Sequence, residues 1–151
     1  THTSDAKSRL RLWLGLLRLT SDIQGELKRK LRVTHGTTLP KFDVLSALAR
    51  HPAGLKMSDL SNYLKLSNGN VTGLVDRLTE DGFVLRVSVP GDRRAQMARL
   101  TPEGSKFFAE VAKDHEAWID DLLSAFSGED ALHLIEQLKT RNSEGTETTT
   151  E

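Results

Sequence analysis

Apolar residues recur every three or four positions along most of this chain of 151 residues, which is the spacing of one helical face. From Asp5 to about Val33, leucines and Ile23 keep that spacing, and Trp13 and Leu17 widen the stripe. The pattern predicts a long helix that is too apolar to stand alone. Similar, shorter patterns predict a helix capped by Thr38 that stops near residues 51–54, one over residues 58–64, and a last one from Ser127 to Leu138.

The stretch LSNGNVTGLVDRL, residues 66–78, fits two different structures. Asn68-Gly69 between apolar stretches favours a hairpin turn, because both residues tolerate positive φ. However, the i, i+3, i+4, i+7 spacing of a buried helical face is kept by Val71, Leu74, Val75 and Leu78. A helix that is capped by Ser67 and begins at Asn68 accounts for every position, so we predict a helix. Its opposite face carries Gly69 and Gly73, and this lack of bulk lets the backbone approach another surface closely.

The period changes in FVLRVSVPGDRRAQMARL, residues 83–100, where β-branched residues are frequent. Pro90-Gly91 suits a type II turn, so a β-hairpin is expected here. Thr101-Pro102 then offers an N-cap followed by proline at the first helical position, which predicts another long helix. The predicted fold is mostly α with a small β-hairpin wing, a winged helix-turn-helix. In this fold the second helix of the motif enters the DNA major groove.

Three blocks of the chain resemble the MarR family of transcriptional regulators: TLPKFDVLSALARHPAG, MSDLSNYLKLSNGNVTGLVDRLTEDGFVLR and DRRAQMARLTPEG. The last block is the most specific, since the family's wing carries Asp-x-Arg followed by Leu-Thr, matched by Asp92, Arg94, Leu100 and Thr101. The resemblance implies a homodimer, a palindromic operator in double-stranded DNA, and often a small ligand that weakens DNA binding. It divides the chain into a dimerisation helix (1–36), the winged domain (37–101), further dimerisation helices (102–140) and a disordered tail (141–151).

The candidate DNA contacts are polar and charged residues of the expected reading helix and wing: Ser67, Asn68, Asn70, Thr72, Arg77, Arg86, Asp92, Arg93 and Arg94. Gly73 stands where the family often has an arginine that contacts DNA, which shifts base reading onto Asn68, Asn70 and Thr72. We expect Asp92 to accept hydrogen bonds from the Arg94 side chain and hold it extended. An arginine at a narrow hairpin tip suits the minor groove.

Each of these residues also has a purely structural interpretation. The two asparagines can serve only as helix caps. Arg77 can pair with Asp81 at i, i+4, and Arg86 can form a cross-strand ion pair. Arg93 and Arg94 can be solubilising charge at a hairpin tip. The sequence alone leaves these alternatives open.

The net charge of zero hides an uneven distribution. Basic residues exceed acidic ones by eight to three over residues 1–33 and by four to one over 86–101, whereas 102–126 and 127–151 each carry two basic and six acidic residues. A basic surface with an acidic rear is therefore compatible with nucleic acid. Cysteine is absent, which excludes disulfides and cysteine chemistry. No apolar run reaches a membrane span and no signal peptide is visible, so a cytoplasmic protein is expected.

No enzyme, cofactor or metal site is expected. No nucleophile, base and orienting residue form a recognisable trio, and no glycine-rich phosphate loop follows a strand. The five histidines lack metal-ligand spacing on a common helix face, and His115 suits a solvated or interface position better than a metal site.

RLWLGLL and SNGNVTGLVDRL are similar to the MarR subgroup that controls catabolism of plant-derived aromatic acids and responds to hydroxycinnamoyl-CoA thioesters or free aromatic acids. The resemblance implies a repressor that an aromatic ligand or its CoA thioester releases from DNA. The candidate ligand residues are Trp13, Leu17, Arg32, His35, Lys41, Phe42 and Trp118. The aromatic residues among them can equally be ordinary core. Two alternatives remain, a ligand-independent regulator and a helical interaction protein without DNA affinity, and the second leaves the wing without a role.

Overall fold

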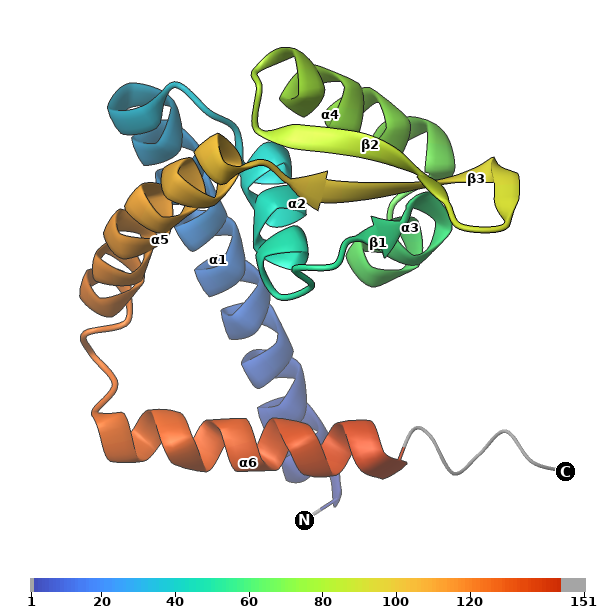
Figure 1. The fold of residues 1–151 in the computed structure, drawn as a ribbon. Helices are drawn as coiled ribbons and strands as arrows, with labels where there is room; N and C mark the ends of the chain where they lie inside the picture. Colours follow the sequence, from blue (N-terminus) through green and yellow to red (C-terminus); the bar gives the residue numbers. More distant parts are fainter. Residues whose placement is uncertain (1, 145–151) are drawn as a thin grey trace, which may run out of the picture. The chain divides into compact units, whose positions relative to one another are not determined.

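Six helices and three strands follow one another in the computed structural model, which describes residues 2–144 and, within them, the side chains of residues 4–141 (Figure 1). They are α1 (His2–His35), α2 (Leu39–Ala49), β1 (Leu55–Lys56), α3 (Met57–Leu64), α4 (Asn68–Glu80), β2 (Val84–Val89), β3 (Asp92–Leu100), α5 (Pro102–Leu122) and α6 (Gly128–Glu144). The chain divides into two units between Glu116 and Ala117, inside α5. The expected mostly helical, winged fold is confirmed.

The long helix α1 exposes most of its apolar stripe. Only Leu27 and Leu31, near its C-terminal end, are buried in the core. Farther toward the N-terminus the stripe is open to solvent, with exposed fractions between 44% and 62% at Leu10, Leu12, Trp13, Leu14, Leu16 and Leu17. Among the described residues of the first unit, therefore, none covers this face of α1.

The caps that the sequence predicts are formed. The hydroxyl of Thr38 accepts a hydrogen bond from the Lys41 backbone N–H at 3.3 Å, and Ser67 Oγ accepts one from the Asn70 N–H at 3.2 Å. Thr101 Oγ1 accepts from the Gly104 N–H at 2.9 Å and donates to the Gly82 carbonyl at 2.7 Å. Each cap satisfies a backbone N–H that lacks an intrahelical acceptor, so the sequence marks where α2, α4 and α5 begin.

Helices α3 and α4 form the helix-turn-helix. Helix α3 ends at Lys65, whose left-handed conformation (φ 54°) turns the chain toward Ser67. The turn is closed by Ser61 Oγ, which donates to the Leu66 carbonyl at 2.5 Å. The helical interpretation of residues 66–78 is confirmed, because α4 buries Val71, Leu74, Val75 and Leu78 together.

The wing is a three-stranded antiparallel sheet in the order β1-β3-β2. The predicted hairpin of β2 and β3 turns at Pro90-Gly91, where the positive φ of Gly91 (81°) suits the second central position of a type II turn. Strand β1 was not predicted, because a two-residue strand is defined only by its pairing with β3. Gly54 precedes β1 at φ 99°, where a Cβ would lie 2.8 Å from the Ala98 carbonyl oxygen.

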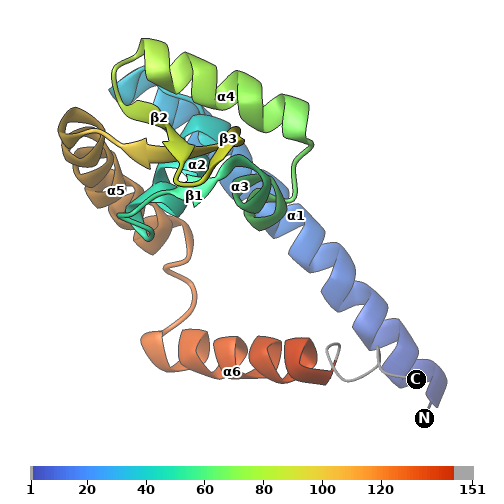
Figure 2. The same cartoon turned by 45° about the vertical axis from the view of Figure 1, so that its right-hand side comes forward.

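The core of the first unit lies where α2, α3 and α4 meet the sheet. Figures 1 and 2 both show α4 running beside β2. The buried residues of this core are Val44, Leu45, Ala47, Leu48, Leu60, Val71, Leu74, Val75, Leu78, Val84 and Ala98. Since one face of α4 packs against this core, its opposite face is exposed and is available to bind another molecule.

The second unit contains the end of α5 and all of α6. A reciprocal pair caps α6: the Ser127 N–H donates to Asp130 Oδ2 at 3.1 Å, and the Asp130 N–H donates to Ser127 Oγ at 3.0 Å. The helix continues past the expected Leu138 to Glu144, with Thr140 Oγ1 donating to the Glu136 carbonyl. Residues 141–144, expected to belong to a disordered tail, are therefore helical, and residues 145–151 lie outside the described residues. No helix in the described part of the chain is long and apolar enough to span a bilayer.

Candidate nucleic-acid interface

The exposed side of α4 begins at its capped N-terminus. Ser67, Asn68, Asn70 and Thr72 are all exposed, so the sequence-predicted reading residues lie on or beside the face opposite the core. The first-turn amides of a helix carry a partial positive charge and suit phosphate oxygens. Asparagine and threonine side chains can bond base edges as well as phosphates. The first turn of α4 thus offers donors for both kinds of DNA contact.

Both glycines of α4 face open space. A Cβ at Gly69 or Gly73 would meet nothing within 4 Å, so packing does not require glycine at either position. A recess of about 300 Å³ lies beside them, lined by Pro40, Leu66, Gly69, Asn70, Gly73, Leu74 and Arg77. The missing side chains leave room for another molecule's surface to approach the helix backbone closely.

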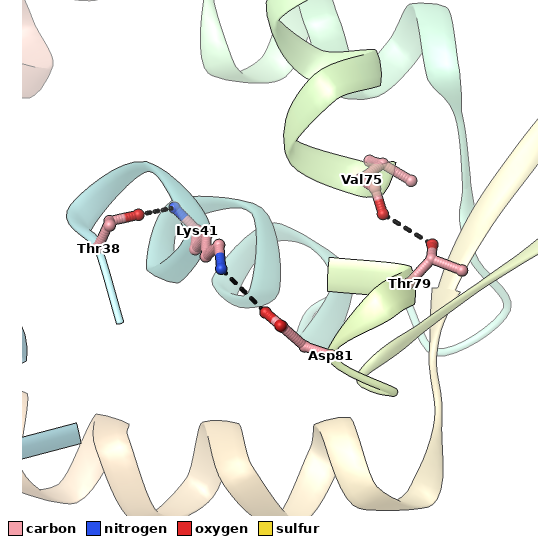
Figure 3. Close-up of polar contacts among 5 residues, drawn as sticks. All are labelled: Thr38, Lys41, Val75, Thr79 and Asp81. Atoms are coloured by element: carbon pink, nitrogen blue, oxygen red, sulfur yellow. Dashed lines mark hydrogen bonds and ion pairs between the residues drawn. The ribbon is translucent and has the colours of Figure 1, made fainter. Parts of the chain in front are cut away.

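Arg77 is exposed and does not form the ion pair with Asp81 that its i, i+4 spacing allows. The Asp81 carboxylate is instead bound by Lys41 of α2, whose Nζ lies 2.9 Å from Asp81 Oδ2 (Figure 3). This contact joins the start of α2 to the end of α4. It leaves the Arg77 guanidinium available to an anion from outside.

Arg86, by contrast, is held inside the domain. Its Nη2 lies 2.6 Å from Asp76 Oδ1 of α4, and its Nη1 donates to Gln96 Oε1 at 3.3 Å. The ion pair that the sequence allowed across the hairpin is therefore formed with the helix, and the cross-strand contact is a hydrogen bond to an amide. Sequence reasoning missed Asp76 as a partner, because no local spacing links the two residues.

The far end of the wing carries two exposed arginines, Arg93 and Arg94. Asp92 Oδ1 accepts a hydrogen bond at 3.0 Å, but the donor is the backbone N–H of Arg94. This corrects the expected side-chain contact: the short Asp92 side chain reaches the main chain two residues on, as in an Asx turn. Asp92 therefore fixes the backbone at the hairpin end and does not engage the Arg94 guanidinium.

Several predicted ligand residues are already engaged within the first unit. His35 Nε2 lies 2.7 Å from Asp114 Oδ2, and its ring meets Phe107 edge-on. Lys41 is bound to Asp81, as described above. Phe42 is 6% exposed and stacks on Phe108 and His115, at centroid distances of 5.6 and 4.5 Å. Burial against these rings lowers the pKa of His115.

The remaining predicted ligand residues are on α1 and in the second unit. Trp13, Leu17 and Arg32 are exposed on α1, and Trp118 is half-buried in the second unit. Within the first unit, the structure thus brings His35 and Phe42 to the junction of α1, α2 and α5. Within the described residues, no group of three or more His, Cys, Asp or Glu is placed to hold a metal ion.

A capped reading helix with an open face, followed by a hairpin with arginines at its end, defines a winged helix-turn-helix of the DNA-binding type. Comparison with known proteins agrees. A family model described as MarR family matches residues 35–95. A MarR family transcriptional regulator from Silicibacter pomeroyi, known by crystal structure, is 36% identical, with 93% of this chain and 96% of that one covered and a TM-score of 0.76.

Two further relatives extend the comparison. The regulator PecS of Dickeya dadantii is 35% identical over 96 residues, 62% of this chain, and the chain spans only 58% of that protein. The structure of Sco3205 from Streptomyces coelicolor, solved in complex with DNA, is 23% identical and shares the fold, with 95% of this chain and 90% of that one covered and a TM-score of 0.81. The chain belongs to the MarR family, a family of transcriptional regulators and not of enzymes.

Proposed function

We propose that this protein is a homodimeric repressor that binds a palindromic operator in double-stranded DNA and is released by a small ligand. The observation that carries the proposal is the pairing of two exposed elements on the first unit. The first turn of α4 is capped by Ser67 and open to solvent, and the wing ends in exposed Arg93 and Arg94. A reading helix and a charged wing are the two parts with which a winged domain contacts the major and minor grooves.

The residues divide by the information they carry. Asn68, Asn70 and Thr72 contact base edges, since their side chains offer both donors and acceptors. Arg77 and the wing arginines contact phosphate or the minor groove, Ser67 holds the first turn of α4 in place as its cap, and Asp92 keeps the hairpin backbone in place. The DNA complex of Sco3205 supports this use of the shared fold. A regulator of this kind acts where the chromosome is, in the cytoplasm.

The dimer is proposed from the uncovered apolar faces. In the first unit, the stripe around Leu12, Trp13 and Leu16 of α1 exposes large apolar side chains along one segment, and a contiguous apolar surface of this kind is typical of an interface. In the second unit, α6 likewise exposes Leu132, Ile135 and Leu138. A second copy of the chain covers such faces, and it also supplies the second reading helix that a palindrome requires.

The proposed effector is an aromatic acid or its CoA thioester. The stacked rings of Phe42, Phe108 and His115 support an aromatic ligand, because a planar molecule can add to or replace one ring of such a stack. His35 and the basic residues that precede it on α1 offer cations for a carboxylate or phosphate. Because Lys41 and His35 are paired with Asp81 and Asp114, an anionic ligand has to compete with those carboxylates.

Selection from a random duplex pool tests the DNA function directly. The protein is expected to enrich a palindromic sequence and to bind it as two chains per duplex, as measured by analytical ultracentrifugation. Enrichment of no sequence, or binding of one chain to a site without symmetry, contradicts the proposal. The effector is tested separately by melting temperature in the presence of benzoate, hydroxycinnamates and hydroxycinnamoyl-CoA. An effector should raise the melting temperature and release the selected duplex, and a panel without effect removes the aromatic ligand from the proposal.

A further inference from the structure

Arg86 sits where the sheet face that packs on α4 changes from apolar to polar. Val84, two residues earlier and therefore on the same face of β2, is 1% exposed and belongs to the core. The Arg86 side chain itself is only 28% exposed. In the neighbouring strand, the Cα partner of Arg86 is the fully buried Ala98, which leaves the guanidinium room to lie against α4.

The guanidinium of Arg86 spans three elements of the fold. Nη2 lies 2.6 Å from Asp76 Oδ1 and donates at 3.4 Å to the Thr72 carbonyl, one turn earlier on α4. Nη1 donates to Gln96 of β3 at 3.3 Å. Among the described residues, Arg86 Nε is the one side-chain atom sealed from solvent without a hydrogen-bond acceptor. Burying a guanidinium with one unsatisfied N–H costs free energy, and the ion pair and the two hydrogen bonds of Arg86 offset that cost. Such a network also fixes the positions of the groups that it joins.

A direct contact between Arg86 and DNA phosphate does not fit this arrangement. To reach outward, the guanidinium has to release Asp76, whose side chain is 54% exposed on the face of α4 that faces away from the core. A bare carboxylate there repels phosphate. The Arg86–Asp76 ion pair neutralises that charge and at the same time ties the wing to the reading helix.

We infer that Arg86 is a positioning residue: through Asp76 and the Thr72 carbonyl it sets the placement of the wing against α4, and so governs which DNA sequence is bound without contacting the DNA. This inference rests on the proposed function. Thr72 is a proposed base-reading residue, and its backbone carbonyl accepts a hydrogen bond from Arg86. The position of Arg86 therefore affects the position of a residue that reads bases. The wing arginines lie beyond Arg86 on the hairpin, so the same contact controls where they reach.

The test compares Arg86→Met, Asp76→Asn and the double variant with Arg93→Met as a matched control. Each is measured on the selected duplex and on a random duplex over a series of salt concentrations. Arg86→Met should weaken binding to the selected duplex about tenfold, a typical effect of losing a charge-assisted hydrogen bond. It should weaken random binding less, through the bared Asp76 carboxylate. In the double variant, which lacks that carboxylate, random binding and the salt slope should match those of the parent. Arg93→Met should lower the slope of log affinity against log salt by about one, because it removes one phosphate contact.

For Asp76→Asn, the expected change in DNA affinity has opposite signs for the two possible roles of Arg86, phosphate contact and positioning residue. If Arg86 is a phosphate contact, removing the neighbouring carboxylate strengthens binding. If Arg86 acts through Asp76, the variant weakens binding to the selected duplex, and the double variant loses no more than either single one. Arg86→Lys keeps the charge but not the fork of donors, so it should restore only part of the specificity.

The outcomes separate the inference from the function it rests on. A parent protein that binds no duplex at low salt overturns both. A parent that binds its selected duplex, with a reduced salt slope in the double variant or tighter binding in Asp76→Asn, overturns the positioning role alone. The melting temperature is recorded for every variant. If Arg86→Met melts at a lower temperature and loses as much affinity for random as for selected DNA, the inference is also contradicted. Asp76→Asn then distinguishes global damage from a phosphate contact, because only a phosphate contact makes that variant bind more tightly.

Discussion

Replacing Ser67 with alanine tests whether the first turn of α4 is ordered for DNA. Ser67 Oγ accepts the hydrogen bond from the Asn70 N–H at 3.2 Å and is the side-chain cap of this helix. The turn it caps contains Gly69 and is followed by Gly73, and glycine is the weakest helix former after proline. The helix start therefore depends strongly on this one bond.

The size of the effect follows from the cap. Loss of a serine cap costs about 1 kcal/mol, which for a protein of this length corresponds to a fall of roughly 2–4 °C in melting temperature. If Asn68 and Asn70 must be held in the first turn to bind, the same energy is lost on binding. That is about a fivefold weaker affinity for the selected duplex.

Two further variants make the assay specific. Thr38→Ala removes the equivalent cap of α2, where Thr38 Oγ1 lies 3.3 Å from the Lys41 backbone nitrogen (Figure 3). It should lower the melting temperature by a similar amount and leave DNA affinity near that of the parent. Ser67→Gly keeps most of the capping preference, at a cost of only a few tenths of a kcal/mol. It should therefore bind the selected duplex almost as well as the parent, by fluorescence anisotropy.

Two results refute this reasoning. If Ser67→Gly loses as much affinity as Ser67→Ala, the hydroxyl contacts DNA itself and its role as a cap is secondary. If Ser67→Ala binds the selected duplex as tightly as the parent while melting lower, the first turn of α4 is not part of the interface.

Five other changes have defined outcomes. Arg94→Ala should weaken DNA binding by roughly 1–3 kcal/mol at an unchanged melting temperature, because the side chain is exposed at the wing end; parental affinity in a titration would remove its groove contact. Asn70→Ala should relax sequence preference in a repeated selection, whereas Arg77→Ala should weaken binding to all duplexes alike. Removal of residues 1–20 should abolish the dimer and operator binding together, and a monomer by sedimentation that still binds the full operator contradicts this. Since burial lowers the pKa of His115 below its unfolded value, its contribution to stability is present above that value and lost as pH falls; His115→Gln should show a smaller loss in urea unfolding between pH 7.5 and 5.

Local signals in the sequence predicted most of the fold. Ser67, Thr38 and Thr101 mark helix starts because a cap acts on an N–H only two or three residues away. Gly91 marks the hairpin turn because only its own φ matters there. Strand β1 has no comparable signal, since two residues become a strand only when β3 lies beside them.

The candidate site was predictable in its residue types and less so in its pairings. Asp92 does bind Arg94, but through the backbone nitrogen, because an aspartate readily closes an Asx turn on the main chain two residues on. Lys41 and Asp81 are far apart in the chain, and so are His35 and Asp114, so their contacts appear only once the helices are packed. The expected aromatic ligand residues were grouped by their chemistry, and in the first unit packing buries Phe42 but leaves Trp13 exposed.

The central claim is that α4 and the wing form a DNA-binding surface, and a salt series on the selected duplex tests it most directly. The account predicts an affinity that falls steeply between about 50 and 200 mM salt, because several phosphates are neutralised, and that exceeds the affinity for a scrambled duplex of equal length at every salt concentration. No measurable affinity at the lowest salt, or equal affinity for both duplexes throughout, would contradict it.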